Sequence, residues 1–135
     1  YTPNADQKTL AHYAIDHGAN LVLGHHPHVL QGIEKYKSAY IVYSLANFCF
    51  GGNTNPPDKD TMIYQQTFVF QNDTLKKTNR IKIIPCSVSS SSGSNNYQPT
   101  PATGKKATKI IQRVNRYSKS LGKVSFGKNG KIRSY

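Results

Sequence analysis

Apolar residues recur at helical spacing in two stretches of the chain. Residues 4–17 are predicted to form the first helix, which Asn4 or Asp6 would cap at its start and Gly18 would end. Residues 105–121 are predicted to form the second helix, with basic side chains including Arg113 on its outer face. The apolar face of the first helix comprises Leu10, Ala11, Ala14 and Ile15, and that of the second comprises Ala107, Ile110, Ile111, Val114, Tyr117 and Leu121.

Between and after the helices, short apolar or alternating runs predict strands that are separated by turn residues. The expected strands span residues 20–23, which would be buried, then 29–36, 40–45, 61–71 and 78–85, and a last small hairpin spans 123–126 and 131–135. Asn72 and Asp73 are expected to form a turn, and Glu34 is expected to be an exposed strand residue. The predicted fold is therefore α/β of the α+β kind, a mainly antiparallel sheet with two packing helices.

Two segments carry breaker residues instead of a periodic pattern. Residues 51–60 contain two glycines and two prolines, and residues 87–96 are rich in serine, so both are expected to be loops. Asp58 and Asp60 in the first loop are candidate metal ligands by residue type alone.

Three of the five histidines lie in the turn after the first predicted strand. His26 and His28 would project to the same side of an extended backbone, because side chains in a strand alternate with a period of two. His25 is the alternative partner of His28 if the turn is tight. Neutral imidazole is a common ligand for zinc, manganese and iron-type ions. The spacing thus predicts either metal or phosphate chemistry, or a solvated cluster without a function.

Asn47 follows a predicted strand that returns toward the end of the sheet where the histidines lie. Its amide can both donate and accept hydrogen bonds. It could orient a histidine, contact a substrate oxygen or simply close a turn, and the sequence leaves these three roles open.

The charge balance adds a second possible activity. Lysine and arginine number 18 against 6 acidic residues, a formal net charge of +12, and such a surface attracts polyanions. Nucleic acid is not the expected partner, because the chain has no interleaved aromatic RNA motif and no helix-turn-helix pattern. A non-enzymatic module that binds a cell-surface polyanion through its basic face is therefore one hypothesis, and a purely solubilising charge is another.

The two cysteines and the hydropathy set further expectations. Cys49 and Cys86 lie in apolar, strand-like surroundings, so buried free thiols are favoured over a disulfide, although pairing stays open. The sequence has no run of eighteen apolar residues, so no membrane segment is expected in this chain. It also shows no signal peptide pattern at its start.

Residues 16–34, centred on Gly24 and the histidines, resemble the bacterial capsule-synthesis family associated with poly-γ-glutamate, a CapA-like branch of the calcineurin-like metallophosphoesterase superfamily. The resemblance continues through residues 43–51, Ile84-Pro85 and residues 98–104. The block from Gly24 to Asn47 is its specific part. Ala46 departs from the family pattern, which has glycine at this position, and this puts the backbone angle of the loop in question.

The resemblance implies several properties. Residues 1–122 would be the C-terminal portion of a four-layer αββα metallophosphatase-like domain, and residues 123–135 a hairpin or tail. His26 and His28, or His25 and His28, would be ligands of a divalent Mn, Zn or Fe-type metal, and Asn47 would orient or contact substrate. Earlier Asp and Asn-His motifs of the superfamily are not present, so this chain alone is expected to be catalytically silent.

The resemblance also implies partners and a location. The expected partners are the missing N-terminal half of the same domain, an anionic polymer such as poly-γ-glutamate, and other capsule-synthesis membrane proteins. A homo-oligomer is a further expectation, because an incomplete sandwich leaves sheet edges uncovered. Family members are usually exported and anchored by an N-terminal segment, which implies an extracytoplasmic, membrane-associated full-length protein.

Overall fold

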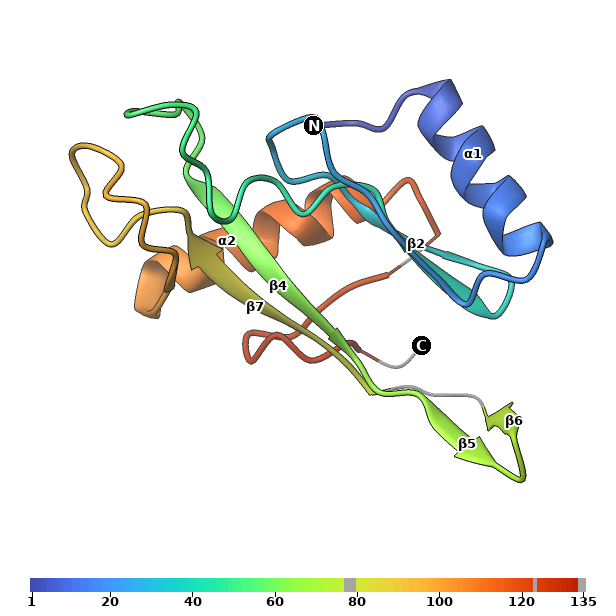
Figure 1. The fold of residues 1–135 in the computed structure, drawn as a ribbon. Helices are drawn as coiled ribbons and strands as arrows, with labels where there is room; N and C mark the ends of the chain where they lie inside the picture. The colour runs from blue at the N-terminus through green and yellow to red at the C-terminus, as the bar shows by residue number, and fades with distance from the viewer. Residues whose placement is uncertain (77–79, 123, 134–135) are drawn as a thin grey trace.

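The computed structural model describes residues 1–76, 80–122 and 124–133, and in this part of the chain it shows an α+β fold (Figure 1). Helix α1 spans Ala5–Asp16 and helix α2 spans Gly104–Ser118. The strands are β1 Leu21–Leu23, β2 Ile33–Tyr36, β3 Ala39–Val42, β4 Asp60–Gln66, β5 Val69–Gln71, β6 Thr74–Lys76, β7 Ile81–Ser87 and β8 Thr100–Pro101. They form sheets in the orders β1-β3-β2, β4-β7-β8 and β5-β6. No helix within these residues is long and apolar enough to cross a membrane.

Helix α1 begins as its sequence predicts. The Asn4 side chain accepts a hydrogen bond from the Gln7 backbone N–H at 2.8 Å, and the Gln7 side chain accepts one from the Asn4 backbone N–H at 2.9 Å, which together make a capping box. Ala11 and Ile15 are buried, but Leu10 is 70% exposed, so its predicted place on the apolar face is wrong. Only the side of the helix that carries Ala11 and Ile15 faces the sheet. Leu10 projects about 100° away from that side around the helix axis.

The first sheet combines one parallel and one antiparallel pair. The predicted hairpin is confirmed as β2 and β3, with Ile33 opposite Val42 and Tyr36 opposite Ala39. Strand β1 runs parallel to β3, an arrangement that the sequence pattern did not indicate. The expectation that β1 is buried is wrong, because it lies at the edge of the sheet and Leu23 is 47% exposed.

The second sheet is built on β4 and β7, which pair antiparallel from Asp60 opposite Ser87 to Gln66 opposite Ile81. The long strand predicted for residues 61–71 is interrupted after Gln66. Beyond that point β5 and β6 form a separate hairpin that extends away from the body of the molecule, and β5 is exposed throughout (Figure 1). The predicted turn is confirmed, since Asn72 and Asp73 have φ angles of +48° and +58°.

The last described residues return to the second sheet. The backbone N–H of Ile83 donates to the Gly130 carbonyl at 2.9 Å, and that of Ile132 donates to the Ile81 carbonyl at 3.0 Å. Phe126 and Ile132 form an antiparallel bridge, in agreement with the hairpin expected there. Position 123 and positions 134–135 of that predicted hairpin lie outside the described residues.

Two apolar clusters lie on the two faces of the first sheet. One contains Ile33 and Val42 with residues of α2 and β7, and the other contains Ile41 with Ala11 and Ile15 of α1. The predicted stripe of α2 is confirmed for Ile110, Ile111 and Val114, which are buried. Leu121 is buried as well, but the helix ends at Ser118, before the predicted end at residue 121. The chain passes close to α2 at Gly32, where an added Cβ would lie 2.5 Å from the Tyr117 carbonyl oxygen.

Candidate functional site

The histidine turn begins at the end of β1, where Gly24 brings the chain tightly against the neighbouring segment. The Gly24 N–H donates to the Val42 carbonyl at 2.7 Å, and a Cβ at this position would lie 2.2 Å from the Tyr43 carbonyl oxygen. Only glycine allows this approach. The turn closes at Leu30, which bridges to Leu45. Residues 25–29 are thus held at the end of the first sheet, beside the segment that carries Asn47.

Three residues around this turn have left-handed backbone angles. The φ angles of His26, His28 and Ala46 are +88°, +59° and +65°. L-residues other than glycine adopt this region infrequently, although histidine does so more often than most, and such residues concentrate at functional sites. These three residues lie in two facing loops, one carrying the histidines and the other carrying Asn47.

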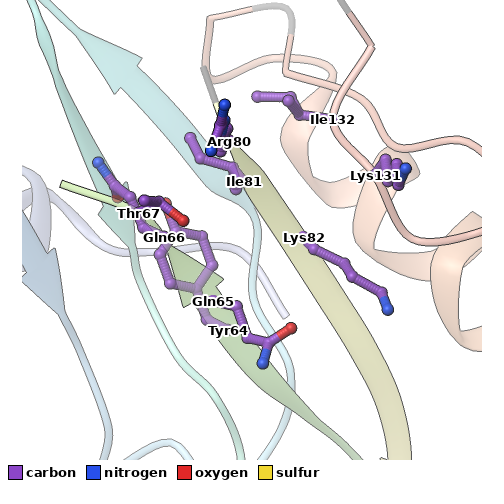
Figure 2. A pocket seen from close by; sticks show the side chains of 9 residues that line it. All are labelled: Tyr64, Gln65, Gln66, Thr67, Arg80, Ile81, Lys82, Lys131 and Ile132. Carbon is purple, nitrogen blue, oxygen red and sulfur yellow. The ribbon is translucent and has the colours of Figure 1, made fainter. Parts of the chain in front are cut away.

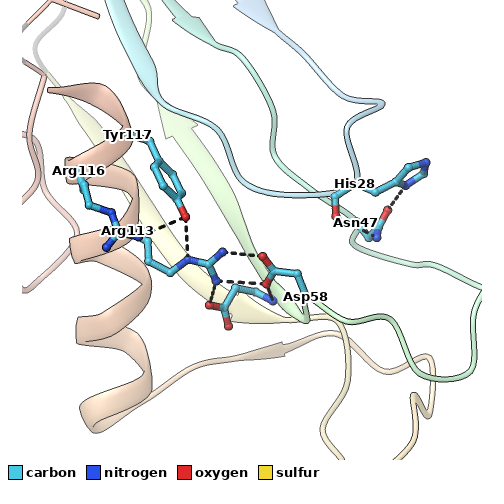
Figure 3. A network of polar contacts seen from close by, with 7 residues as sticks. His28, Asn47, Asp58, Arg113, Arg116 and Tyr117 are labelled. Carbon is cyan, nitrogen blue, oxygen red and sulfur yellow. Dashed lines mark hydrogen bonds and ion pairs between the residues drawn. The ribbon is translucent and has the colours of Figure 1, made fainter. Parts of the chain in front are cut away.

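The structure brings His28 and Asn47 into direct contact, as Figure 3 shows. His28 Nδ1 lies 2.6 Å from Asn47 Oδ1, and Asn47 Nδ2 donates to the His28 carbonyl at 3.4 Å. An amide oxygen only accepts hydrogen bonds, so His28 Nδ1 carries the proton. In the neutral ring, Nε2 then keeps a free lone pair. Asn47 is buried, whereas the ring that it orients is exposed.

The other two histidines of the turn have different neighbours. The ring of His26 lies near that of His28, with centroids 6.1 Å apart and planes at 44°. His25 instead lines a neighbouring pocket of about 390 Å³ together with Ala46, Phe48 and Cys49. Cys49 is exposed and Cys86 is buried, and both thiols are free, so the prediction of burial is confirmed for Cys86 and wrong for Cys49. Cys49 is exposed because it lies in the loop beyond the first sheet.

The residues of the histidine turn have some of the features that a metal ion requires. A histidine that binds a metal through Nε2 usually donates its Nδ1–H to an oxygen, and His28 with Asn47 has this arrangement. Within the described ranges, however, no three His, Cys, Asp or Glu side chains lie close enough together to hold a metal. A catalytic zinc site normally has three protein ligands. The histidine turn therefore fits part of a metal site and does not form a complete one from these residues.

A second network, of ion pairs and hydrogen bonds, links the loop of residues 51–60 to α2 (Figure 3). Arg113 Nη2 lies 2.5 Å from Asp58 Oδ2, Arg113 Nη1 contacts Asp60, and Arg113 Nε donates to the Tyr117 hydroxyl at 3.3 Å. The predicted outward position of Arg113 is wrong, because the two carboxylates hold its guanidinium over the loop. Asp58 and Asp60, candidate metal ligands by residue type, are occupied by this ion pair.

Burial and Arg113 act on the pKa of Asp58 in opposite directions. Burial of the carboxyl raises its pKa, but the hydrogen bonds and charge of Arg113 outweigh that effect and lower the pKa below its usual value. The hydrogen bonds that Arg113 donates to Asp58, in turn, raise the pKa of the Arg113 guanidinium, so it stays charged.

Glu34 is a partly buried hydrogen-bond acceptor that the sequence pattern did not indicate. Its side chain is only 13% exposed, so its predicted exposure is wrong. It accepts hydrogen bonds from the Tyr43 hydroxyl at 2.5 Å and from His12 Nε2 at 3.0 Å. His12 also stacks on Tyr36 at 3.9 Å. Burial raises the pKa of Tyr43, and its hydrogen bond to Glu34 raises it further. The cluster ties α1 to the first sheet, and only knowledge of how α1 packs could have indicated it.

Comparison with known proteins places the histidine turn in a matched region. The family model described as "Bacterial capsule synthesis protein PGA_cap" matches residues 1–52, which include the three histidines and Asn47. The "PGA biosynthesis protein CapA" of Bacillus subtilis (strain 168) is 35% identical over 133 residues, which cover 93% of this chain and 30% of that protein.

Two further relatives match shorter segments. The "Capsule biosynthesis protein CapA" of Bacillus anthracis is 50% identical over 48 residues, covering 36% of this chain and 12% of that protein. The "Uncharacterized protein y4sH" of Sinorhizobium fredii (strain NBRC 101917 / NGR234) is 44% identical over 54 residues, covering 40% of this chain and 12% of that protein. The chain thus spans less than a third of the length of the relatives that it matches.

Proposed function

This chain belongs to the CapA-like family of bacterial capsule synthesis proteins, and we propose that its histidine turn is one wall of a metallophosphatase-like site. The protein would act in the synthesis or export of capsular poly-γ-glutamate, and the name of the B. subtilis relative, which gives PGA biosynthesis, supports the synthesis part. In this proposal the chain is one part of the complete site, and the rest of the protein supplies the remaining ligands.

The observation that carries the proposal is the contact between His28 and Asn47. A short hydrogen bond of 2.6 Å fixes the ring and leaves its outer nitrogen with a free lone pair. His26 stands beside it with the ring centroids 6.1 Å apart. A solvated cluster without a function would not need a buried amide to fix one of its rings.

The assigned roles follow from these positions. His28 and His26 would hold a divalent Mn, Zn or Fe-type ion, with His25 as the alternative partner of His28, and Asn47 would keep His28 in the binding tautomer. When bound, such an ion supplies Lewis-acid polarisation of a phosphoryl oxygen and activates water. We also propose that the second and first sheets form part of the αββα sandwich of the metallophosphoesterases, and that the complete protein works at the extracytoplasmic face of the membrane.

Calorimetric titration of the complete protein with Mn²⁺ and Zn²⁺ tests the proposed metal site. The variant His26→Ala/His28→Ala should lose at least one binding event or weaken it strongly. His17→Ala is the matched control, because this exposed histidine caps α1 and lies outside the turn. The control should bind both metals like the wild type. Unchanged metal binding in the double variant would refute the assignment.

The capsule itself provides the functional readout. A strain that lacks the complete protein should regain cell-associated poly-γ-glutamate when it receives the wild-type gene or the His17→Ala gene. The His26→Ala/His28→Ala gene should not restore it, provided that immunoblots show equal protein levels. Full restoration by the double variant would mean that the histidine turn is dispensable for the pathway.

A further inference from the structure

A larger pocket, of about 790 Å³, lies where the C-terminal tail runs along β7 (Figure 2). It is lined by residues 64–67 of β4 and its extension, residues 80–82 at the start of β7, and residues 131–132 of the tail. None of the three histidines of the turn lines it. Its volume is within the range of about 300–1,000 Å³ that is usual for ligand sites.

The strand register sets one row of side chains on the open face of this sheet. Gln65 pairs with Lys82 across β4 and β7, and Lys82 in turn pairs with Lys131 of the tail. Directly paired residues point to the same face of a sheet. Ile81 and Ile83 are buried on the opposite face, so Lys82 and its row face solvent.

The row carries charges of one sign. Lys82 and Lys131 stand directly opposite each other, an arrangement that destabilises a sheet when the charges are alike. Arg80 lines the same pocket, and no carboxylate does. Across the described part of the chain, the ion pairs join His12 to Glu34, Lys37 to Asp16, and Arg113 to Asp58 and Asp60. Neither Lys82 nor Lys131 takes part in them.

Neutral hydrogen-bonding groups accompany the cations. Gln65 and Thr67 line the pocket and supply an amide and a hydroxyl. Adjacent strands lie about 4.8 Å apart, and residues two apart on one strand lie about 7 Å apart. One small oxyanion would therefore not engage all the cations at full contact, whereas a chain with repeated anionic groups would.

We propose that this pocket binds the repeated oxyanion groups of an anionic polymer. The groups are carboxylates if the polymer is a polyglutamate and phosphates if it is a phosphodiester polymer. The pocket is inferred from its own side chains and does not depend on a metal at the histidine turn. Only the choice of polyglutamate as the first probe rests on the proposed function.

Binding of fluorescent γ-linked oligoglutamate to the complete protein, measured by polarisation in buffer with EDTA, tests the inference. The variant Lys82→Gln/Lys131→Gln should weaken binding about tenfold. Lys105→Gln/Lys106→Gln is the matched control, because it removes the same two charges from exposed positions on α2. The control should weaken binding less than about twofold, since distant exposed charges are screened by salt. Both substitutions are at the surface, so both variants should fold, as circular dichroism would verify.

Three comparisons decide the outcome. Equal weakening by the two lysine pairs would overturn the proposal, because it would show binding by net charge alone. Absence of binding to both oligoglutamate and a glycerol-phosphate oligomer would overturn it as well. Selective loss for one of the two probes would support the pocket and identify its anion. His26→Ala/His28→Ala should bind like the wild type, so failure of the metal-site proposal would leave this result unchanged.

Discussion

At the scale of single residues, Ala46 has a left-handed backbone angle that glycine would adopt without strain. Its φ angle of +65° costs an alanine about 1–2 kcal/mol. Glycine would remove that strain, but it would lose about 0.4–1 kcal/mol through the greater freedom of the unfolded chain. It would also lose about 0.8 kcal/mol from the buried methyl group. The opposing effects nearly cancel, so alanine is tolerated here.

The near cancellation of these free-energy terms at Ala46 predicts different effects on stability for two substitutions. Ala46→Gly should change the free energy of unfolding by less than about 0.5 kcal/mol. Ala46→Val should destabilise the protein by about 2 kcal/mol or more, because a β-branched residue fits poorly at positive φ and Ala46 is packed in the core. Urea denaturation measures both values. A valine variant as stable as the wild type would show that the loop does not have the left-handed angle.

Asn47 is predicted to affect metal binding at the proposed site through His28. Asn47→Ala should lower the affinity of the complete protein for Mn²⁺ or Zn²⁺ by about 10–100-fold, because the Nδ1–H of His28 loses its acceptor. Asn47→Asp keeps an oxygen at this position and should retain most of the affinity. Calorimetry on both variants gives the comparison. If the aspartate variant loses as much affinity as the alanine variant, Asn47 does not act by orienting His28.

The sequence allowed part of this site to be predicted residue by residue. The return of Asn47 toward the histidines was predictable, and the two loops do meet. The extended backbone expected at His26 and His28 is wrong, because both residues have left-handed φ angles, although their rings lie near each other. The sequence could not predict whether His25 or His26 lies beside His28. That choice depends on the backbone angles of His26 and His28, which both have left-handed φ values. No local sequence pattern indicates those angles.

At the scale of elements, the link between α2 and the loop before β4 depends on one guanidinium. Asp58 and Arg113 have side chains that are 12% and 22% exposed, so solvent screens their contact only in part. Asp58→Asn should reduce the free energy of unfolding at pH 7 by about 1.5–3 kcal/mol, the usual value for a hydrogen bond to a charged group. Asp16→Asn should cost less, because Asp16 pairs with Lys37 in solvent.

The effect of Asp58 should depend on pH in a defined direction. Its pKa is lowered in the folded protein, so its contribution to stability is fully present above the unfolded pKa of about 3.9. That contribution is lost as the pH falls through the folded pKa. The stability difference between wild type and Asp58→Asn should therefore shrink below about pH 4 in denaturant titrations. A difference that stays constant down to pH 2 would show that folding does not lower the pKa of Asp58.

The pairing of the tail with β7 leads to a prediction that needs no ligand. Lys131→Glu should raise the free energy of unfolding by about 0.2–1 kcal/mol, because an opposite charge then faces Lys82. Lys128→Glu, at an exposed turn position, makes the same charge change away from β7 and is the control. Guanidinium chloride would mask charge effects, so urea is the denaturant to use. A gain that is equal in both variants would reflect net charge and not the lysine pair.

Elements with a long periodic pattern were predictable, and those set by tertiary position were not. The stripe of α2 and the hairpin of β2 and β3 follow directly from periodicity. The run at residues 61–71 also reads as one strand, but β5 has no core to cover it and separates after Gln66. Helical periodicity predicts an outward position for Arg113. It cannot indicate the ion pairs of this residue, because the partners lie 53 and 55 positions earlier in the chain.

At the scale of the whole molecule, β1 has the composition of an inner strand and the position of an edge strand. Leu21 packs against one apolar cluster and Val22 against the other, as in parallel strands that are covered on both faces. Yet β1 pairs only with β3, and Leu23 is 47% exposed. An apolar edge of this kind invites pairing with another strand. The B. subtilis relative is longer than this chain, which covers 30% of it, and we propose that a strand from outside these 135 residues covers this edge.

Hydrogen exchange can test whether another strand covers β1. In the complete protein, the amides of residues 21–23 should exchange about as slowly as those of β3, because a further strand would protect the open edge. In the isolated 135-residue chain they should exchange faster, while Ala39–Val42 of β3, buried in both, serve as the internal control. A second copy of the chain is the competing partner, and it would make protection in the isolated chain rise with protein concentration. Equal and rapid exchange of residues 21–23 in both proteins would mean that β1 is a true edge and that the sheet ends there.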